Sequence, residues 1–230
     1  MIKTIFIDLG ETLIDMHSYD CIEEELEIPF WRRHGYIGNI VDFKEAKKKT
    51  VKEFIEKGHR KKDENFIWGM ILAKNLGLKP DREVAKEDHK LASNYYTEKA
   101  MLRDGAIEML KFLKKRGLKI IMISNNWSDM ANRIIDKVKI RQYFNDIIIS
   151  DDLMSIKSEL KPFSKALEIS GSKPNECLMV GDCEEDAFCK KLGIKFVWLD
   201  TGKISIKMSY DYRIETLDNL KKIIGDSDGN

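Results

Sequence analysis

Five short, nearly continuous apolar runs constrain the fold of this chain more than any other feature. Runs of this kind are typical of parallel strands buried on both faces, because strands with one solvent-exposed face alternate apolar and polar residues. The runs are Ile2–Asp8, Leu118–Ser124, Asp146–Ser150, Cys177–Asp182 and Lys195–Asp200, with Tyr210–Glu215 as a weaker sixth candidate. The sequence therefore predicts a mostly parallel β-sheet.

From residue 104 onward, segments with the apolar spacing of helices separate the predicted strands. They are Asp104–Arg116, a helix with Ser128 as its N-cap that runs through Val138, and then Pro162–Ser170, Glu185–Leu192 and Ile214–Ile224. Regular alternation of strands and helices predicts an α/β fold with a doubly wound, Rossmann-like sheet core.

Residues 16–99 differ from the rest of the chain, because they contain no clear strand. Asp42, Asp63 and Asp81 each precede a helical pattern of apolar residues, and each is predicted to cap a helix. We therefore expect residues 1–15 and 100–230 to form the α/β core and residues 16–99 to form an all-helical insert.

Composition argues against several classes of function. The chain has 40 Lys and Arg residues and 39 Asp and Glu residues, so its charge gives no reason to expect nucleic acid or an anionic membrane as a partner. No apolar stretch approaches the ~20 residues of a membrane-spanning helix, and Asp8 and Glu11 interrupt any signal-peptide pattern. The four cysteines lack zinc-site spacing and are expected to be free thiols. We expect a cytoplasmic monomer or homodimer with a small-molecule substrate.

Polar residues follow the predicted strands in a suggestive order. They are Asp8, then Ser124 with Asn125, then Lys157 or Lys161, and finally Asp182 with Asp186. Any one of them alone could be a helix cap, a turn residue or a solvated side chain. Ligands of open α/β sheets bind beyond the carboxyl ends of the strands, where parallel neighbouring strands would bring these groups together. Their occurrence in this order favours a functional site.

This pattern resembles the haloacid dehalogenase (HAD) superfamily, most of whose members are phosphatases. D-L-G-E-T, from Asp8 to Thr12, resembles its first motif, and Ser124 resembles the second. The stretch K-S-E-L-K-P-F resembles the third motif, with Lys157 as the expected active-site lysine and Lys161 as the alternative. G-D-C-E-E-D, which begins at Gly181, resembles the fourth. The helical insert resembles the cap domain of the family.

The resemblance implies phosphoryl transfer through an aspartyl-phosphate on Asp8. Phosphoryl transfer is mostly positioning and charge stabilisation, and carboxylate oxygens suit Mg²⁺. The expected substrate-binding groups are Ser124, Asn125, Lys157 and Thr12. The expected Mg²⁺ ligands are Asp8, the backbone carbonyl of Gly10, Asp182 and Asp186, of which Asp186 is expected to act one step further out.

Gly10 departs from the family pattern. Typical phosphatases of the family have an Asp here, which protonates the leaving group and then activates water, and such help contributes about 10²–10⁴-fold. The leaving group can be one that needs no proton, as in an anhydride or acyl phosphate. Glu11 or a residue of the insert can replace the missing acid. The chemistry can differ, as in dehalogenases and phosphonate-cleaving members. The chain can also be a weak catalyst that mainly binds a ligand.

We favour a Mg²⁺-dependent phosphohydrolase that acts on a small phosphorylated metabolite. A 2-haloacid dehalogenase-like hydrolase is the alternative enzyme, and a catalytically weak ligand-binding protein is the alternative of another class. Dehalogenases of the family need no metal, so the presence of both Asp182 and Asp186 favours the phosphohydrolase.

Overall fold

The computed structural model describes residues 1–15, 21–56, 65–203 and 205–226. The chain divides into two compact units, one formed by residues 1–16 with 100–230 and the other by residues 17–99. The first boundary predicted from the sequence, between residues 15 and 16, lies one residue earlier than this division.

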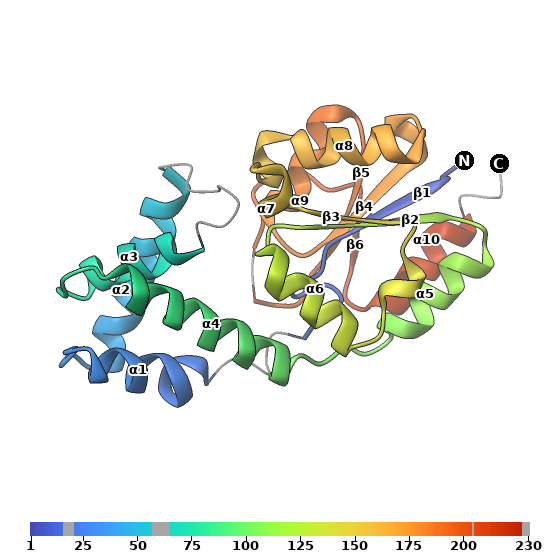
Figure 1. Cartoon of the computed structure of the whole chain (residues 1–230). Helices are drawn as coiled ribbons and strands as arrows, with labels where there is room; N and C mark the ends of the chain where they lie inside the picture. The colour runs from blue at the N-terminus through green and yellow to red at the C-terminus, as the bar shows by residue number, and fades with distance from the viewer. Residues whose placement is uncertain (16–20, 57–64, 204, 227–230) are drawn as a thin grey trace. The chain divides into compact units, whose positions relative to one another are not determined.

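The first unit contains a six-stranded sheet whose neighbouring strands all run parallel (Figure 1). In chain order the strands are β1 (Thr4–Ile7), β2 (Lys119–Ser124), β3 (Asp146–Ile149), β4 (Cys177–Gly181), β5 (Lys195–Leu199) and β6 (Tyr212–Ile214). Every residue of β1 and β4 is buried, as the continuous apolar runs predicted. The spatial order is β3-β2-β1-β4-β5-β6, so the direction of winding reverses at β1 and β4.

Helices cover both faces of this sheet, which confirms the predicted doubly wound α/β core. Figure 1 shows α8 over one face and α5, α6 and α10 over the other. The helices are α5 (Ala106–Lys115), α6 (Ser128–Lys137), α7 (Ser150–Leu153), α8 (Lys161–Ser170), α9 (Glu184–Ala187) and α10 (Leu220–Asp226). Short 3₁₀ turns are η3 (Arg141–Tyr143), η4 (Lys157–Glu159), η5 (Pro174–Glu176), η6 (Phe188–Leu192) and η7 (Leu217–Asn219).

Two predicted helix starts in this unit are wrong. Ile214 pairs with Leu199 as the last residue of β6, so the final helical segment begins only at Leu217. Ser128 is the first helical residue of α6, and the extended residue Trp127 holds the N-cap position. The start of α6 is instead capped from a distant segment. The backbone N–H of Ser128 donates to the Asp151 carboxylate at 3.1 Å, and its hydroxyl donates to Asp152 at 3.0 Å.

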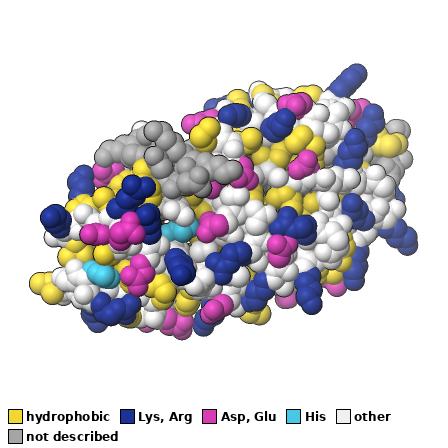
Figure 2. All heavy atoms as spheres, in the orientation of Figure 1, with side chains coloured by type: hydrophobic (Ala, Val, Ile, Leu, Met, Phe, Trp, Pro, Cys, Tyr) yellow, Lys and Arg dark blue, Asp and Glu magenta, His cyan; other side chains and the backbone are white. Residues whose placement is uncertain are grey.

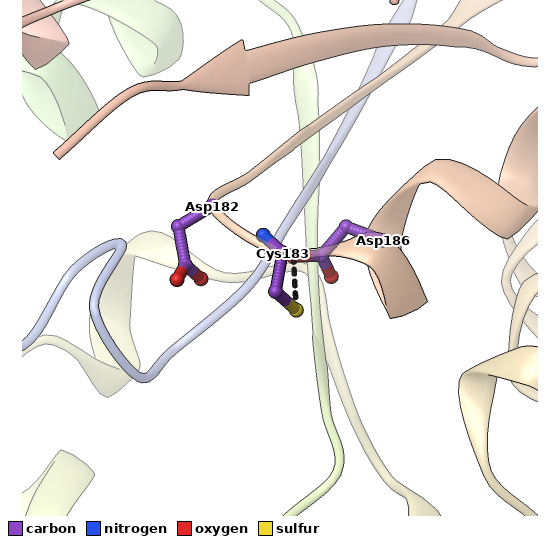
Figure 3. A group of neighbouring side chains, drawn as sticks. All are labelled: Asp182, Cys183 and Asp186. Carbon is purple, nitrogen blue, oxygen red and sulfur yellow. Dashed lines mark hydrogen bonds between the residues drawn. The ribbon is translucent and has the colours of Figure 1, made fainter. Parts of the chain in front are cut away.

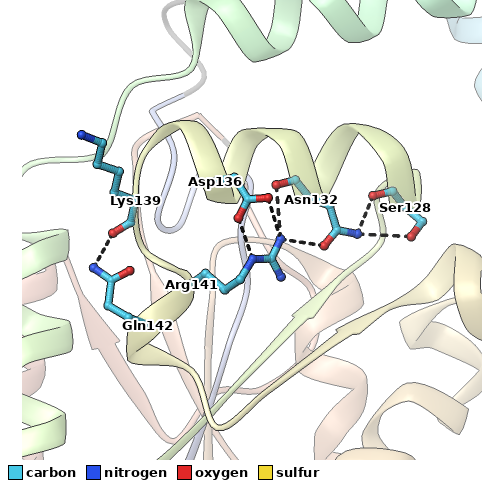
Figure 4. Close-up of polar contacts among 6 residues, drawn as sticks. All are labelled: Ser128, Asn132, Asp136, Lys139, Arg141 and Gln142. Atoms are coloured by element: carbon cyan, nitrogen blue, oxygen red, sulfur yellow. Dashed lines mark hydrogen bonds and ion pairs between the residues drawn. The ribbon is translucent and has the colours of Figure 1, made fainter.

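A polar network fixes the other end of α6 (Figure 4). The Arg141 guanidinium donates to both carboxylate oxygens of Asp136, at 2.6 and 3.1 Å, and to Oδ1 of Asn132 at 2.8 Å. Gln142 donates to the backbone carbonyl of Lys139 at 2.6 Å. These bonds close the turn between α6 and β3 and so help to set where β3 enters the sheet.

The second unit is helical, and its described residues contain no strand. It comprises the π-helix η2 (Glu23–Glu27), α1 (Ile28–Arg33), α2 (Ile40–Glu56), α3 (Phe66–Asn75) and α4 (Arg82–Lys99). Its core gathers Phe30, Trp31, Tyr36, Phe43 and Leu72, among others.

Two of the three predicted helix caps of this unit can be checked. Asp81 caps α4, because its Oδ1 accepts the N–H groups of Glu83 and Val84 at 2.8 and 3.1 Å. Asp42 lies inside α2, and Asn39 is the cap, since its Oδ1 accepts the N–H groups of the second and third helical residues at 2.8 and 3.1 Å. Asp63 lies outside the described residues.

Surface charge is mixed in sign. On the face in Figure 2, basic and acidic side chains alternate without a large patch of either kind. None of the described helices is long and apolar enough to cross a membrane. The cytoplasmic location stays a prediction.

Candidate active site

The site lies where the winding of the sheet reverses, at the carboxyl ends of β1 and β4. Open α/β sheets bind their ligands at such switch points. Ile7 pairs with Val180, and the N–H of Asp8 donates to the carbonyl of Val180 at 3.0 Å. The first residues beyond β1 and β4 therefore lie side by side. After Asp8 the chain makes one tight turn, in which the N–H groups of Leu13 and Ile14 both donate to the carbonyl of Leu9 at 2.9 Å.

Lys157 joins two of the predicted acids. Its Nζ donates to Oδ1 of Asp8 and, at 2.6 Å, to Oδ1 of Asp186. Lys157 is 1% exposed and Asp186 is fully buried. An ammonium and two carboxylates are removed from water only where their mutual attraction and hydrogen bonds offset a large desolvation cost. Lys161, the alternative lysine, has its ammonium at the surface and donates to the carbonyl of Leu153 at 2.8 Å.

Asn125 helps to place Lys157. Its Oδ1 accepts the backbone N–H of Lys157 at 3.1 Å and the hydroxyl of Ser150 at 2.6 Å. Lys157 begins the 3₁₀ turn η4, and Leu160 ends that turn in the left-handed region at φ 67° before α8 begins. We expected a backbone N–H of Asn125 to bind substrate. The structure also shows its side chain holding the lysine loop.

The G-D pair after β4 has a clear steric basis. A Cβ added at Gly181 would lie 2.1 Å from Oδ2 of Asp186, so only glycine lets this carboxylate approach the strand end. Asp186 turns back to accept the N–H of Cys183 at 3.3 Å and its thiol at 3.2 Å. Figure 3 shows Asp182, Cys183 and Asp186 together beyond the end of β4. The indole N–H of Trp198 fixes the same turn by donating to the Asp182 carbonyl at 3.0 Å.

The site carries more negative than positive charge. Burial raises the pKa of Asp8 to about 6, with Lys157 opposing the shift and Asp186 adding to it. Burial, Asp8 and Asp186 together raise the pKa of Asp182 to about 8. Burial alone would lower the pKa of Lys157, but the carboxylates of Asp186 and Asp8 raise it above its usual range. With every group ionised, three carboxylates and one ammonium leave a charge of −2.

Asp182 gives the test of whether a divalent cation fits. Its side chain is 5% exposed, and no described residue donates a hydrogen bond to its carboxylate. A buried carboxylate without a donor is costly unless a cation or bound water accompanies it. Oxygen donors and an excess charge of −2 match a hard divalent ion such as Mg²⁺. The residues present therefore fit the predicted cofactor.

Two hydroxyls at the same edge of the sheet also lack partners. Thr12 is fully buried, and its Oγ1 has no hydrogen-bond partner among the residues that the structure describes. Ser124 ends β2 and is 3% exposed, and no side-chain hydrogen bond is formed by its hydroxyl within the described chain. Both were predicted to bind substrate, and both have an unused donor.

Gly10 and Glu11 differ sharply in their surroundings. Within the described part of the first unit, a Cβ added at Gly10 would meet no heavy atom within 4 Å. Glu11 adopts the left-handed region at φ 54°, which costs a non-glycine residue about 1–2 kcal/mol. Its carboxylate binds Arg103 and Lys203, each at 2.7 Å. Glu11 thus connects the turn after β1 with two distant segments.

Comparison with known proteins decides the family. A family description of haloacid dehalogenase-like hydrolases matches residues 2–188. This chain belongs to that family. A glyceraldehyde 3-phosphate phosphatase of Pyrococcus abyssi is 30% identical to the hydrolase over 239 residues, covering 100% of this chain and 96% of that protein. A pyrophosphatase of Bacillus mycoides is 29% identical over 127 residues, covering 53% of this chain and 59% of that protein.

The fold of the hydrolase is shared with solved structures. A HAD-type protein of Bacillus subtilis, crystallised bound to magnesium, matches it with a TM-score of 0.75 at 18% identity, covering 97% of this chain and 98% of that one. At this level of identity the match shows the common fold.

Sequence reasoning missed three parts of the site. The side chain of Asn125 was not expected to position the lysine loop, and the two cations on Glu11 were not foreseen. Cys183 was considered only as a free thiol. A usable signal existed for Cys183, because it lies between two acids of one motif. For Arg103 and Lys203 there was none, since they are 92 and 192 residues from Glu11 along the chain.

Proposed function

We propose that the hydrolase is a Mg²⁺-dependent phosphohydrolase that acts through Asp8 on a small phosphorylated metabolite with a good leaving group. One observation carries the proposal. Lys157 bridges Asp8 and Asp186 in a buried cluster, while the neighbouring Asp182 carboxylate has no donor among the residues that the structure describes. Such a site needs a bound cation. With that cation in place, the site can bind the anionic phosphoryl group of a substrate. Residues 17–99 are proposed to form a cap that selects the substrate.

Asp8 is the proposed nucleophile. Lys157 binds its Oδ1, so we assign the attack to Oδ2. As the bond between Oδ2 and phosphorus forms, the bond from phosphorus to the leaving oxygen breaks, and the leaving group departs with the electron pair. Water then attacks the phosphorus of the aspartyl-phosphate, the bond to Oδ2 breaks, and the Asp8 carboxylate is restored. The proton of the water goes to solvent.

Lys157 has a second task in this proposal. An ammonium has three N–H donors, and two of them bind Asp8 and Asp186. The third is free to bind a phosphoryl oxygen, together with the unpartnered hydroxyls of Ser124 and Thr12. Asp8, the carbonyl of Gly10 and Asp182 would hold Mg²⁺, with Asp186 acting one step further out, and the bound ion would neutralise the charge between carboxylate and phosphate.

The leaving group is the finer part of the proposal. Gly10 has no proton to give, and the Glu11 carboxylate is bound to two cations. An anhydride or acyl phosphate releases a phosphate or carboxylate, which is a stable anion and needs little acid help. One relative is named as a pyrophosphatase, whose substrate class is an anhydride. The other is named for glyceraldehyde 3-phosphate, so an alkyl phosphate belongs in the same assay.

The test measures phosphate release from acetyl phosphate, pyrophosphate and glyceraldehyde 3-phosphate, with Mg²⁺ and with EDTA. We expect metal-dependent turnover that is fastest on the first two and is lost in Asp8→Asn. Asp200→Asn is the matched control. Asp200 also follows a strand, but its carboxylate pairs with Arg213 at 2.6 Å and is not bound to Lys157. Metal-independent release of chloride from 2-chloropropionate would replace the proposal with a dehalogenase. Tight binding of a phosphorylated ligand without turnover would replace it with a binding protein.

A further inference from the structure

Cys183 stands within the candidate site without a part in the proposed hydrolysis. It is a free cysteine that lies between Asp182 and Asp186 at the end of β4. Its thiol donates to Oδ2 of Asp186 at 3.2 Å and thereby supports the first turn of α9. A serine would make the same bond, so capping alone does not call for sulfur.

The three side chains present ligand atoms at close range. One oxygen of Asp182, Sγ of Cys183 and one oxygen of Asp186 all lie within 4.8 Å of one another. Figure 3 shows the three side chains grouped on one side of the turn. Zinc bonds of about 2.3 Å to sulfur and about 2.1 Å to oxygen place tetrahedral ligands about 3.6 Å apart. The present separation of 3.2 Å between Sγ and Oδ2 is close to that value.

A second observation points to a cation at this place. Asp182 as a whole is 5% exposed, and its carboxylate has no hydrogen-bond donor within the described residues. It therefore has ligand capacity to spare beside the sulfur. Asp186 is fully buried and binds Lys157 through Oδ1, so Oδ2 is the oxygen next to Cys183.

We propose that Asp182, Cys183 and Asp186 bind a thiophilic divalent cation such as Zn²⁺ or Cd²⁺. As the metal–sulfur bond forms, the thiol proton leaves to solvent and its bond to Asp186 is lost. Soft thiolate ligands favour zinc and cadmium over magnesium, whereas carboxylates accept both kinds of ion. Two of the three ligands are also proposed Mg²⁺ ligands, so the two ions compete. Binding of the soft cation does not rest on the proposed hydrolysis, whereas the competition rests on the proposed Mg²⁺ ligands.

The experiment titrates the full chain with Cd²⁺ and follows the ultraviolet charge-transfer absorption of the cadmium–sulfur bond. We expect the absorption to saturate at one equivalent, to disappear on addition of Zn²⁺, and to require more Cd²⁺ when Mg²⁺ is in excess. It should be absent in Cys183→Ser and unchanged in Cys21→Ser, which alters an exposed cysteine elsewhere. Losing an outer-shell partner already weakens metal binding about 10–100-fold. We therefore expect Cys183→Ser to weaken Zn²⁺ binding at least about tenfold.

Asp182→Asn keeps the thiol and provides a second test if the serine variant does not fold. It should weaken Cd²⁺ binding while circular dichroism shows an intact fold. The proposal is overturned if the absorption persists in Cys183→Ser or if it depends on Cys21. Failure of the tests on sulfur would leave the phosphatase assay, which uses Mg²⁺ alone, unaffected. Absence of competition by Mg²⁺ would instead count against Asp182 and Asp186 as Mg²⁺ ligands.

Discussion

An aspartate at position 10 would supply the acid that the first motif lacks. The first unit has room for it, because a Cβ added at Gly10 meets no heavy atom of the described residues within 4 Å. The backbone there lies outside the left-handed region, so a side chain brings no conformational strain. Gly10→Asp should therefore fold. A fourth carboxylate takes the charge of the metal-free site from −2 to −3, which we expect to cost on the order of 1–3 kcal/mol of stability.

The expected gain depends on the leaving group. General acid help contributes about 10²–10⁴-fold, or about 3–5 kcal/mol of barrier, where the leaving oxygen needs a proton. Gly10→Asp should therefore accelerate hydrolysis of glyceraldehyde 3-phosphate towards that range. Acetyl phosphate releases acetate, a stable anion that needs no proton, so its rate should change little. The ratio of the two kcat/KM values is the informative quantity, because changes in folding or metal affinity affect both substrates.

Gly10→Asn is the matched control, since it has the size of aspartate without the acid. Steady-state kinetics at saturating Mg²⁺ should separate the two variants on the alkyl phosphate alone. If Gly10→Asp is no faster than Gly10→Asn while both bind Mg²⁺, the reasoning about the missing acid is refuted. If both substrates accelerate equally, the added carboxylate acts on the metal rather than on the leaving group.

Three further predictions follow from the same contacts. Gly181→Ala should lower stability by about 1–3 kcal/mol and reduce Mg²⁺-dependent activity, because its Cβ would lie 2.1 Å from the Asp186 carboxylate. Thermal melting should show this loss of stability in Gly181→Ala and almost none in Gly10→Ala. Equal melting temperatures for the two variants would contradict the steric argument. Asp182→Asn should stabilise the metal-free protein at pH 8 by up to about 5 kcal/mol, but not at pH 4. The pKa of Asp182 is raised from 3.8 to about 8 in the folded protein, so the wild-type fold loses stability as pH rises between those values. Urea unfolding in EDTA tests this, and a wild-type protein that is the more stable at pH 8 would be inconsistent with it. Asn39→Ala should cost about 0.5–2 kcal/mol through loss of the α2 cap, which urea unfolding also measures. If Asp42→Ala costs more, the cap has been assigned to the wrong residue.

The strands were predictable from the sequence because burial on both faces leaves a strong local signal. All six predicted strands are present, including the weak sixth, and their ends differ from the prediction by at most two residues. Helix starts were less predictable, because caps are chosen by distant partners. Ser128 looks like an N-cap by type, but Asp151 and Asp152 satisfy its donors across 23 and 24 residues of chain.

The site was predictable to the level of residue type and order, and less so in its connections. Lys157 and Lys161 are four residues apart, and only the 3₁₀ turn and the left-handed Leu160 decide which one turns inward. The bridge from Lys157 to Asp8 spans 149 residues, so no local pattern encodes it. Asn125 illustrates the same limit. It was expected to bind the phosphate through its backbone, but its side chain accepts the backbone N–H of Lys157 and so holds the loop that carries this lysine.

The charge of the site bears on all three candidate functions. A phosphate ester and a 2-haloacid are both anions, and a buried site with more carboxylates than ammonium groups, of charge −2 when all are ionised, repels either one. The cations Arg103 and Lys203 do not remove this excess, because they are paired with Glu11. An anionic ligand therefore needs a bound cation first, whether or not it is then turned over. We expect inorganic phosphate to bind by calorimetry only when Mg²⁺ is present, and Asp182→Asn to weaken this dependence. Turnover of a 2-haloacid in EDTA would overturn the charge argument and the phosphohydrolase proposal together.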